Sequence, residues 1–282
     1  MPGTLYVVAT PIGNLEDITM RALRVLRDVD LIACEDTRHT ARLLGHYDIR
    51  KPTTSYHEHN ENEKAGPLLD KLESGLNIAL VSDAGTPCIS DPGYRIVRQA
   101  HERRIDVVPV PGPCSFIAAL SASGRACDAF TFLGFLPSRR NARAALLNEL
   151  RDEHRTLIFF ESPERLLETL EDLDRILGSR SLTIARELTK IYEELFSGTP
   201  REGIEHFARK TVKGEIVLIV EPGTRAEGSL ESLDIIALRQ QVAEMTQHDG
   251  MMKTEAVKQL ARELNVSRRE LYRMLAKDER SS

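Results

Sequence analysis

The chain has 282 residues, enough for more than one compact unit, and its 41% hydrophobic and 29% charged residues are typical of a globular protein. Its net charge of −5 and pI near 6.0 argue against a protein that holds bare nucleic acid by charge alone, because such proteins carry a broad basic face. A local basic patch that docks on a folded ribonucleoprotein is still compatible with these values.

Membrane insertion and secretion are not indicated. No apolar run approaches the ~20 residues that span a bilayer, and the N-terminus lacks the pattern of a signal peptide. The cysteines show no close pairing and predict neither a zinc ribbon nor a disulfide framework; they are Cys34, Cys88, Cys114 and Cys127. We therefore expect a reduced, cytoplasmic protein with small buried thiols.

Short apolar runs alternate with amphipathic stretches in the first part of the chain. Strands are predicted at residues 5–9, 31–34, 78–81 and 107–110, and helices at residues 19–29, 37–47 and 94–102. Continuous apolar strands between helices predict a mostly parallel sheet with helices on both faces.

A break near residues 124–126 begins a second α/β unit. Its predicted strands are residues 130–133, 156–160, 182–185, 193–196 and 216–220. The third and fourth of these are close enough to form a hairpin, which predicts a mixed sheet. Residues 221–229 are predicted to be a linker, followed by helices at 254–264 and 267–276, with Ser267 as a plausible N-cap. The predicted domains are therefore residues 1–124, 125–224 and 225–282.

Three loops of the first unit follow predicted strands directly, at residues 10–17, 82–93 and 111–113. Ligands of open parallel sheets bind at the carboxyl ends of the strands, where such loops converge. Each loop is rich in glycine or proline, which one tight turn alone would explain, but three at one edge favour a ligand cleft. Asp83 and Asp91 are placed to bind a ribose or an ammonium group. Neither a dinucleotide-binding glycine fingerprint nor a phosphate-binding loop occurs.

Several long motifs in these regions resemble the ribosomal RNA small subunit methyltransferase I family, the 16S rRNA 2′-O-ribose cytidine branch of the tetrapyrrole methylase superfamily. They lie at residues 8–18, 34–38, 82–93, 132–137, 159–165, 185–190 and 213–215. The resemblance extends over nearly the whole chain. The corrin-forming branch usually has a more glycine-rich first loop than residues 10–17.

The resemblance implies two αβα domains that enclose S-adenosylmethionine (SAM) between them, and a homodimer. Together with the element pattern, it predicts an α/β protein with one mostly parallel and one mixed sheet, followed by a small C-terminal helical domain. It places SAM contacts in the first domain at Pro11, Gly13, Asp83, Ala84, Gly85, Thr86, Pro111, Gly112, Pro113 and Ser115. In the second domain it places them at Phe160, Glu161 and Arg186.

Methyl transfer to a ribose hydroxyl needs alignment of the nucleophile and a group that accepts its proton. Our candidates for that catalytic role are Asp83, Glu187 and Lys190. An ion pair between Glu187 and Lys190 is an equally good interpretation of those two residues. His57 and His59 have a metal-ligand spacing but no further ligands nearby, so we expect a polar loop and no metal.

RNA contact is expected from basic residues in three places. The first is Arg38, in a motif where Asp36 or Thr37 can also cap the next helix. The second is a predicted turn entering a helix, with Arg139, Arg140 and Arg143. The third is the last predicted helix, with Arg268, Arg269 and Arg273. A solvated helix face is an alternative for the second group, and a packing or dimer element is an alternative for the third.

The resulting prediction is SAM-dependent 2′-O-methylation of a cytidine in the decoding region of 16S rRNA, on the small ribosomal subunit. One alternative is methylation of a small molecule such as a tetrapyrrole. Another is a ligand-responsive DNA-binding regulator, which only the helical tail favours.

Overall fold

The computed structural model describes residues 2–223, 235–247, 251–263, 271–272 and 274–275. The chain forms two compact units, of which one comprises Met1–Asn148 with Arg155–Glu221 and the other Glu149–His154 with Pro222–Ser282. The first predicted α/β domain lies in the first unit, as does the second apart from residues 149–154 and 222–224. The three-part division at residues 124 and 224 stays a prediction.

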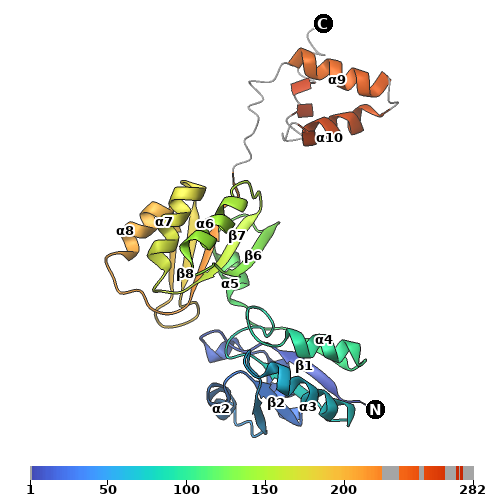
Figure 1. The fold of residues 1–282 in the computed structure, drawn as a ribbon, viewed down its shortest axis with the longest axis vertical. Coiled ribbons are helices and arrows are strands. Elements are labelled where there is room, and N and C mark those ends of the chain that lie inside the picture. The colour runs from blue at the N-terminus through green and yellow to red at the C-terminus, as the bar shows by residue number, and fades with distance from the viewer. Residues whose placement is uncertain (1, 224–234, 248–250, 264–270, 273, 276–282) are drawn as a thin grey trace. The chain divides into compact units, whose positions relative to one another are not determined.

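A five-stranded sheet forms the first part of the larger unit, in the spatial order β3-β2-β4-β1-β5. Figure 1 labels two of its strands, β1 and β2, among helices α2, α3 and α4. The strands are β1 (Thr4–Val8), β2 (Leu31–Cys34), β3 (Thr53–Ser55), β4 (Ile78–Val81) and β5 (Asp106–Val110). All neighbouring pairs are parallel. The sheet confirms the parallel arrangement and the four predicted strands, and adds the short edge strand β3.

Helices cover both faces of this sheet, and β4 shows how. Its side chains alternate between two apolar clusters: Ile78 and Leu80 pack with residues of α3 and α4, whereas Ala79 and Val81 pack with residues of α1 and α2. These helices are α1 (Met20–Asp28), α2 (Thr37–His46), α3 (Glu61–Glu73) and α4 (Tyr94–Glu102). A strand buried on two faces must be apolar throughout, which explains the continuous apolar run from Ile78 to Val81.

The second sheet has the order β6-β7-β10-β8-β9. Its strands are β6 (Phe130–Phe135), β7 (Thr156–Glu161), β8 (Leu182–Arg186), β9 (Glu194–Gly198) and β10 (Ile216–Val220). The pair β6 and β7 is parallel, and the other three pairs are antiparallel. The predicted mixed sheet and the predicted hairpin of β8 with β9 are both confirmed.

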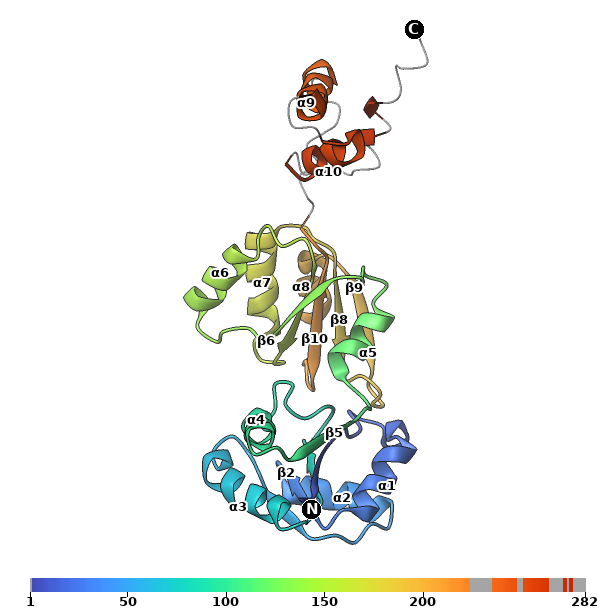
Figure 2. The same cartoon turned by 90° about the vertical axis from the view of Figure 1, so that its right-hand side faces the viewer.

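Helix α5 (Ser115–Ala122) packs on one face of the second sheet, where its Ala119 and Leu120 meet Ile158, Ala185 and Val217. The other face carries α6 (Arg140–Glu149), α7 (Leu166–Leu177) and α8 (Pro200–Phe207), as Figure 2 shows. Helix α8 begins with a capping box, in which the side chains of Thr199 and Glu202 bind each other's backbone amides.

The smaller unit contains α9 (Ile235–Gln247) and α10 (Lys253–Glu263). Ala256, Val257, Leu260 and Ala261 of α10 are buried at helical spacing, and they pack with residues of α9 and with Leu271 and Leu275. The predicted helix at 254–264 is confirmed within one residue. Ser267, predicted as an N-cap, lies outside the described residues, and no described helix is long and apolar enough to cross a membrane.

Candidate functional site

The loops after β1 and β4 are joined by main-chain hydrogen bonds at the carboxyl edge of the first sheet. The amide of Thr10 donates to the carbonyl of Gly85 at 2.8 Å, and the Gly85 amide donates back at 3.1 Å. Gly85 has φ +83°, a backbone conformation that residues other than glycine adopt only with strain. The Thr86 hydroxyl donates to the carbonyl of Pro113 at 3.0 Å, which ties in the loop after β5. The three predicted loops therefore do converge.

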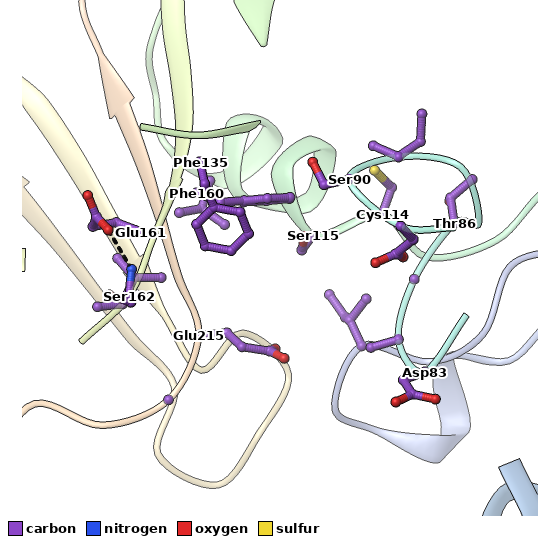
Figure 3. Close-up of a pocket in the computed structure, with 18 of the residues that line it drawn as sticks. Asp83, Thr86, Ser90, Cys114, Ser115, Phe135, Phe160, Glu161, Ser162 and Glu215 are labelled. Atoms are coloured by element: carbon purple, nitrogen blue, oxygen red, sulfur yellow. Dashed lines mark hydrogen bonds between the residues drawn. The ribbon is translucent and has the colours of Figure 1, made fainter. Parts of the chain in front are cut away.

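A cavity of about 410 Å³ opens beside these loops, and its walls come from both sheets (Figure 3). Residues of the first half that line it are Ile12, Glu35, Asp83, Ala84, Gly85, Thr86, Ile89, Ser90, Asp91, Cys114 and Ser115. The second half contributes Phe135, Phe160, Glu161, Ser162, Pro163 and residues 214–217. The volume is within the usual range for a small-molecule site.

Acidic side chains dominate the charge of this cavity: Glu35, Asp83, Asp91 and Glu215 all line it. Burial, assisted by the other three carboxylates, raises the pKa of Asp91 to about 6, although a hydrogen bond involving Ser82 opposes the rise. Burial and the nearby Asp83 also raise the pKa of Glu35. Carboxylates that disfavour one another's ionisation form a site that a bound cation would stabilise.

Asp83 is held in place by its neighbour across the sheet edge, because its Oδ1 accepts the amide of Asp36 at 3.0 Å. The side chain of Asp36 in turn caps α2 by accepting from the amide of Arg38, as one of the two sequence interpretations predicted. Asp83 also lines a second cavity, of about 210 Å³, together with Thr10, Pro11, Leu15, His39, Thr40, Arg42, Leu43 and Ser82. It therefore lies at the boundary of two cavities.

Glu161 lines the large cavity, but its carboxylate points away from it (Figure 3). That carboxylate is fully buried and accepts hydrogen bonds from the Ser162 amide at 2.7 Å and from the Thr169 hydroxyl at 2.6 Å. Arg165 pairs with it at 2.6 Å. The side chain of Glu161 thus fastens the end of β7 to α7, so any ligand contact at this position is left to its backbone.

Glu187 and Lys190 form the ion pair that was one of the two predicted interpretations, with Nζ to Oε1 at 2.8 Å. Lys190 also reaches Glu215 at 3.1 Å. Burial alone would raise the pKa of Glu187, but hydrogen bonds from Lys190 and from the Glu215 amide lower it below its ordinary value. The pair therefore holds Glu215 at the cavity wall, while a catalytic role for either residue stays a prediction.

Gly13 lies in a close contact between the loop after β1 and the loop after β8. A Cβ at this position would stand 2.4 Å from Cγ of Lys190 and 2.7 Å from Oγ1 of Thr189. Gly112 is similarly constrained, since its Cβ would stand 2.9 Å from that of Ala9. Both glycines were predicted as SAM contacts, and the contacts described for them are packing between loops.

The predicted SAM residues divide into two groups. Those that line the large cavity are Asp83, Ala84, Gly85, Thr86, Ser115, Phe160 and Glu161. Those outside its described lining are Pro11, Gly13, Pro111, Gly112, Pro113 and Arg186. Arg186 instead donates to Glu194 at 3.0 Å and to the carbonyl of Lys213 at 3.1 Å. Sequence reasoning omitted Glu35 and Glu215, although both lie in motifs that carried the resemblance.

One predicted RNA contact is wrong. The side chain of Arg143 is fully buried and pairs with the equally buried Asp172 at 2.8 Å, which joins α6 to α7. Arg38 is 88% exposed but pairs with Asp36 at 2.7 Å, and Arg139 and Arg140 are exposed. Arg268, Arg269 and Arg273 lie outside the described residues. In the described part of the chain no group of three metal-binding side chains occurs, and His57 is hydrogen-bonded to Asn60 at 3.1 Å.

Solved structures with this fold include several named as methyltransferases and one named as a synthase. Cobalt precorrin-4 methyltransferase aligns with a TM-score of 0.59 over 77% of this chain and 94% of its own, at 16% identity. Diphthine synthase aligns with a TM-score of 0.62 at 13% identity, over 78% and 90% of the two chains. Uroporphyrin-III C-methyltransferase from Thermus thermophilus, solved in complex with S-adenosylhomocysteine, aligns with a TM-score of 0.56 at 19% identity, over 79% and 99%. At these identities the likeness shows the fold alone.

Sequence relatives are far more similar. A protein of Synechocystis sp. named ribosomal RNA small subunit methyltransferase I is 49% identical over 96% of this chain and 97% of its own length. Proteins of the same name from Haemophilus influenzae and Halalkalibacterium halodurans are 53% and 48% identical, over 82% and 96% of this chain and 83% and 93% of their own. The profile of tetrapyrrole (corrin/porphyrin) methylases matches residues 4–203. The chain therefore belongs to the tetrapyrrole methylase family and, within it, to the proteins named ribosomal RNA small subunit methyltransferase I.

Proposed function

We propose that this protein transfers the methyl group of SAM to the 2′-hydroxyl of a cytidine in the decoding region of 16S rRNA, on the small ribosomal subunit. The observation that carries the substrate class is the 48–53% identity to proteins named for small-subunit rRNA methylation. The 2′-oxygen and the cytidine follow from the sequence resemblance. We further propose that the enzyme acts in the cytoplasm, where its substrate is made, and as a homodimer.

The large cavity fits SAM by the chemistry of its lining. SAM carries a sulfonium and an ammonium group, and the cavity presents Glu35, Asp83, Asp91 and Glu215 to them. Phe135 and Phe160, with ring centroids 5.5 Å apart, give it an apolar aromatic wall. When bound, SAM supplies a methyl group already activated by the positive sulfur.

Because the donor is already activated, the protein's main task is to align the hydroxyl and accept its proton. Asp83 is the best candidate for the proton acceptor, since it lines both the large cavity and the adjoining smaller one. A donor in the first cavity and a ribose at the second would meet at this carboxylate. The hydrogen bond from the Asp36 amide keeps it oriented.

The charge of the cavity does not separate RNA from a tetrapyrrole substrate, and it is the 48–53% identity to proteins named for rRNA methylation that favours RNA. Uroporphyrin-like tetrapyrroles are polycarboxylates, and the four carboxylates of the lining would repel them. The same carboxylates repel RNA phosphates, so the RNA backbone must be held outside this cavity by basic residues.

The test is to map the methyl group on the product. Small subunits from a strain that lacks the gene are incubated with the purified protein and SAM, and nuclease digests of the 16S rRNA are analysed by mass spectrometry. We expect one new 2′-O-methylcytidine in the decoding region. A methyl group on a base, or no new mark although SAM binds, would refute the proposed function.

A further inference from the structure

The exposed side of α2 carries basic residues beside the smaller cavity. Thr40, Leu43 and Leu44 bury the opposite side of this helix against the first sheet. Arg38, His39 and Arg42 are exposed, and His39 and Arg42 line the cavity of about 210 Å³ that ends at Asp83. Two adjacent turns of one helix thus bring basic side chains to the edge of a hollow.

Some exposed arginines of this unit are neutralised by a carboxylate, and others, Arg42 among them, have no described ionic partner. On α4, Arg95 and Arg98 each pair with a glutamate, and Arg103, just after the helix, pairs with Asp70 and Glu73. Arg38 is paired with Asp36. In the part of the chain that the structure describes, no carboxylate lies within ion-pair distance of Arg42 or His39. Their hydrogen-bond donors are therefore available to an anion from outside the protein.

The size of the hollow sets what can enter it. At ~30 Å³ per water molecule, 210 Å³ corresponds to about seven waters, room for one sugar or base ring. Its lining includes the polar residues Thr10, Ser82 and Asp83 and the apolar residues Pro11, Leu15 and Leu43. Polar, apolar and basic side chains around a cavity of this size match one ribose with its attached phosphate.

We propose that this smaller cavity is the acceptor site, in which Arg42 and His39 contact the backbone phosphate beside the target nucleotide and thereby place its ribose at Asp83. The proposal rests on the proposed function, because it takes the substrate to be RNA. It explains how an acidic reaction cavity can work on a polyanion: the phosphate is held by α2, and only the ribose reaches the carboxylates. Arg42 and His39 are then substrate-positioning residues.

The test uses Arg42→Gln in the full chain, with Arg50→Gln as the matched control. Arg50 is also exposed, lies four residues beyond the end of α2 and is not among the residues that line the cavity, so both variants lose the same charge. Three quantities are measured: the affinity for small subunits at a series of KCl concentrations, the affinity for SAM by calorimetry, and KM and kcat for methyl transfer.

We expect Arg42→Gln to raise the Kd and KM for subunits about tenfold, since a charged hydrogen bond is lost. The slope of log affinity against log salt should fall by about one, as for one lost phosphate contact. The SAM affinity and kcat should not change, and Arg50→Gln should change the subunit Kd far less. Arg42→Lys, which keeps the charge without the planar fork, should lie between the two.

Three outcomes would overturn the inference. Subunit binding by Arg42→Gln equal to that of Arg50→Gln would show that Arg42 contacts no phosphate. A loss of SAM affinity in Arg42→Gln would show that this arginine instead holds the carboxylate of the methyl donor. A lower kcat with unchanged KM would assign it to chemistry rather than to binding. If the wild-type protein methylates subunits in any of these cases, the proposed function stands and only the acceptor site is refuted. If the wild-type protein binds subunits through Arg42 but methylates nothing, the phosphate contact stands and the proposed function is refuted.

Discussion

The buried pair of Arg143 and Asp172 gives a sharp test of the reassignment of Arg143 from RNA contact to structure. Both side chains are completely buried between α6 and α7, and Nη2 of Arg143 lies 2.8 Å from Oδ2 of Asp172. Removing one partner of a buried pair costs about 3–5 kcal/mol of unfolding free energy, because the other charge is left without compensation. In Arg143→Ala, Asp172 keeps Arg175 at 2.7 Å and Arg140 at 3.5 Å, so we expect the lower end, about 3 kcal/mol.

The reciprocal variant should be worse. In Asp172→Ala, the buried Arg143 keeps only Glu168, which is 67% exposed and 3.5 Å away, so we expect about 5 kcal/mol. At roughly 2–4 °C per kcal/mol for a unit of this size, the two melting temperatures should fall by about 6–12 °C and 10–20 °C. Replacing both residues with apolar ones, as in Arg143→Met with Asp172→Leu, should recover much of the loss.

The assay is denaturant unfolding followed by circular dichroism, with the exposed Arg139→Ala as a control that should change stability by less than about 0.5 kcal/mol. If Arg143→Ala unfolds like wild type and instead raises KM for ribosomal subunits, the structural assignment is wrong. The original prediction of an RNA contact would then be restored.

Two further predictions concern the large cavity. Gly13→Ala places a Cβ 2.4 Å from Cγ of Lys190, so the loops after β1 and β8 must separate. We expect the affinity for SAM, measured by calorimetry, to fall more than the stability of the fold. Gly45→Ala is the control, because a Cβ there meets open space, and it should bind SAM normally. Burial and three neighbouring carboxylates raise the pKa of Asp91 to about 6, so the folded protein holds the proton of Asp91 more tightly than the unfolded chain does. The stability that this proton contributes is therefore full below about pH 4 and is lost as the pH rises through about 6. Cationic SAM favours the ionised form of Asp91, so the Kd for SAM should be about tenfold higher at pH 5 than at pH 7. Asp91→Asn should flatten that dependence. A wild-type Kd that is the same at both pH values would show that the charge of Asp91 does not contribute to SAM binding.

Much of the fold followed from local pattern, because burial on both faces leaves a direct trace in the sequence. The run from Ile78 to Val81 had to be a central strand, and the short connection between residues 185 and 193 predicted the hairpin of β8 with β9. The loops at residues 10–17, 82–93 and 111–113 were predicted to meet because parallel strands end at one edge. The bridge between Thr10 and Gly85 confirms that argument for the first two.

The directions of charged side chains did not follow from the sequence. Arg143 precedes Leu147 by one helical turn, and both are buried, but nothing local shows that Asp172, 29 residues later, would neutralise the arginine. Glu161 ends a strand at the cavity, yet its direction depends on the hydroxyl of Thr169 in the next helix. The residues brought to the cavity by the second sheet, such as Glu215, depend on how the two halves pack, which no single motif encodes.

The role of Asp83 in methyl transfer from SAM to ribosomal RNA is measured directly by single-turnover transfer of tritium from labelled SAM to small subunits. We predict that the wild-type protein labels the 16S rRNA. Asp83→Asn should bind SAM and subunits but transfer the label about 10²–10⁴ times more slowly, the usual range for loss of a proton acceptor. Unlabelled RNA with the wild type despite bound SAM would rule out rRNA as the acceptor, and a wild-type rate in Asp83→Asn would rule out Asp83 as the proton acceptor.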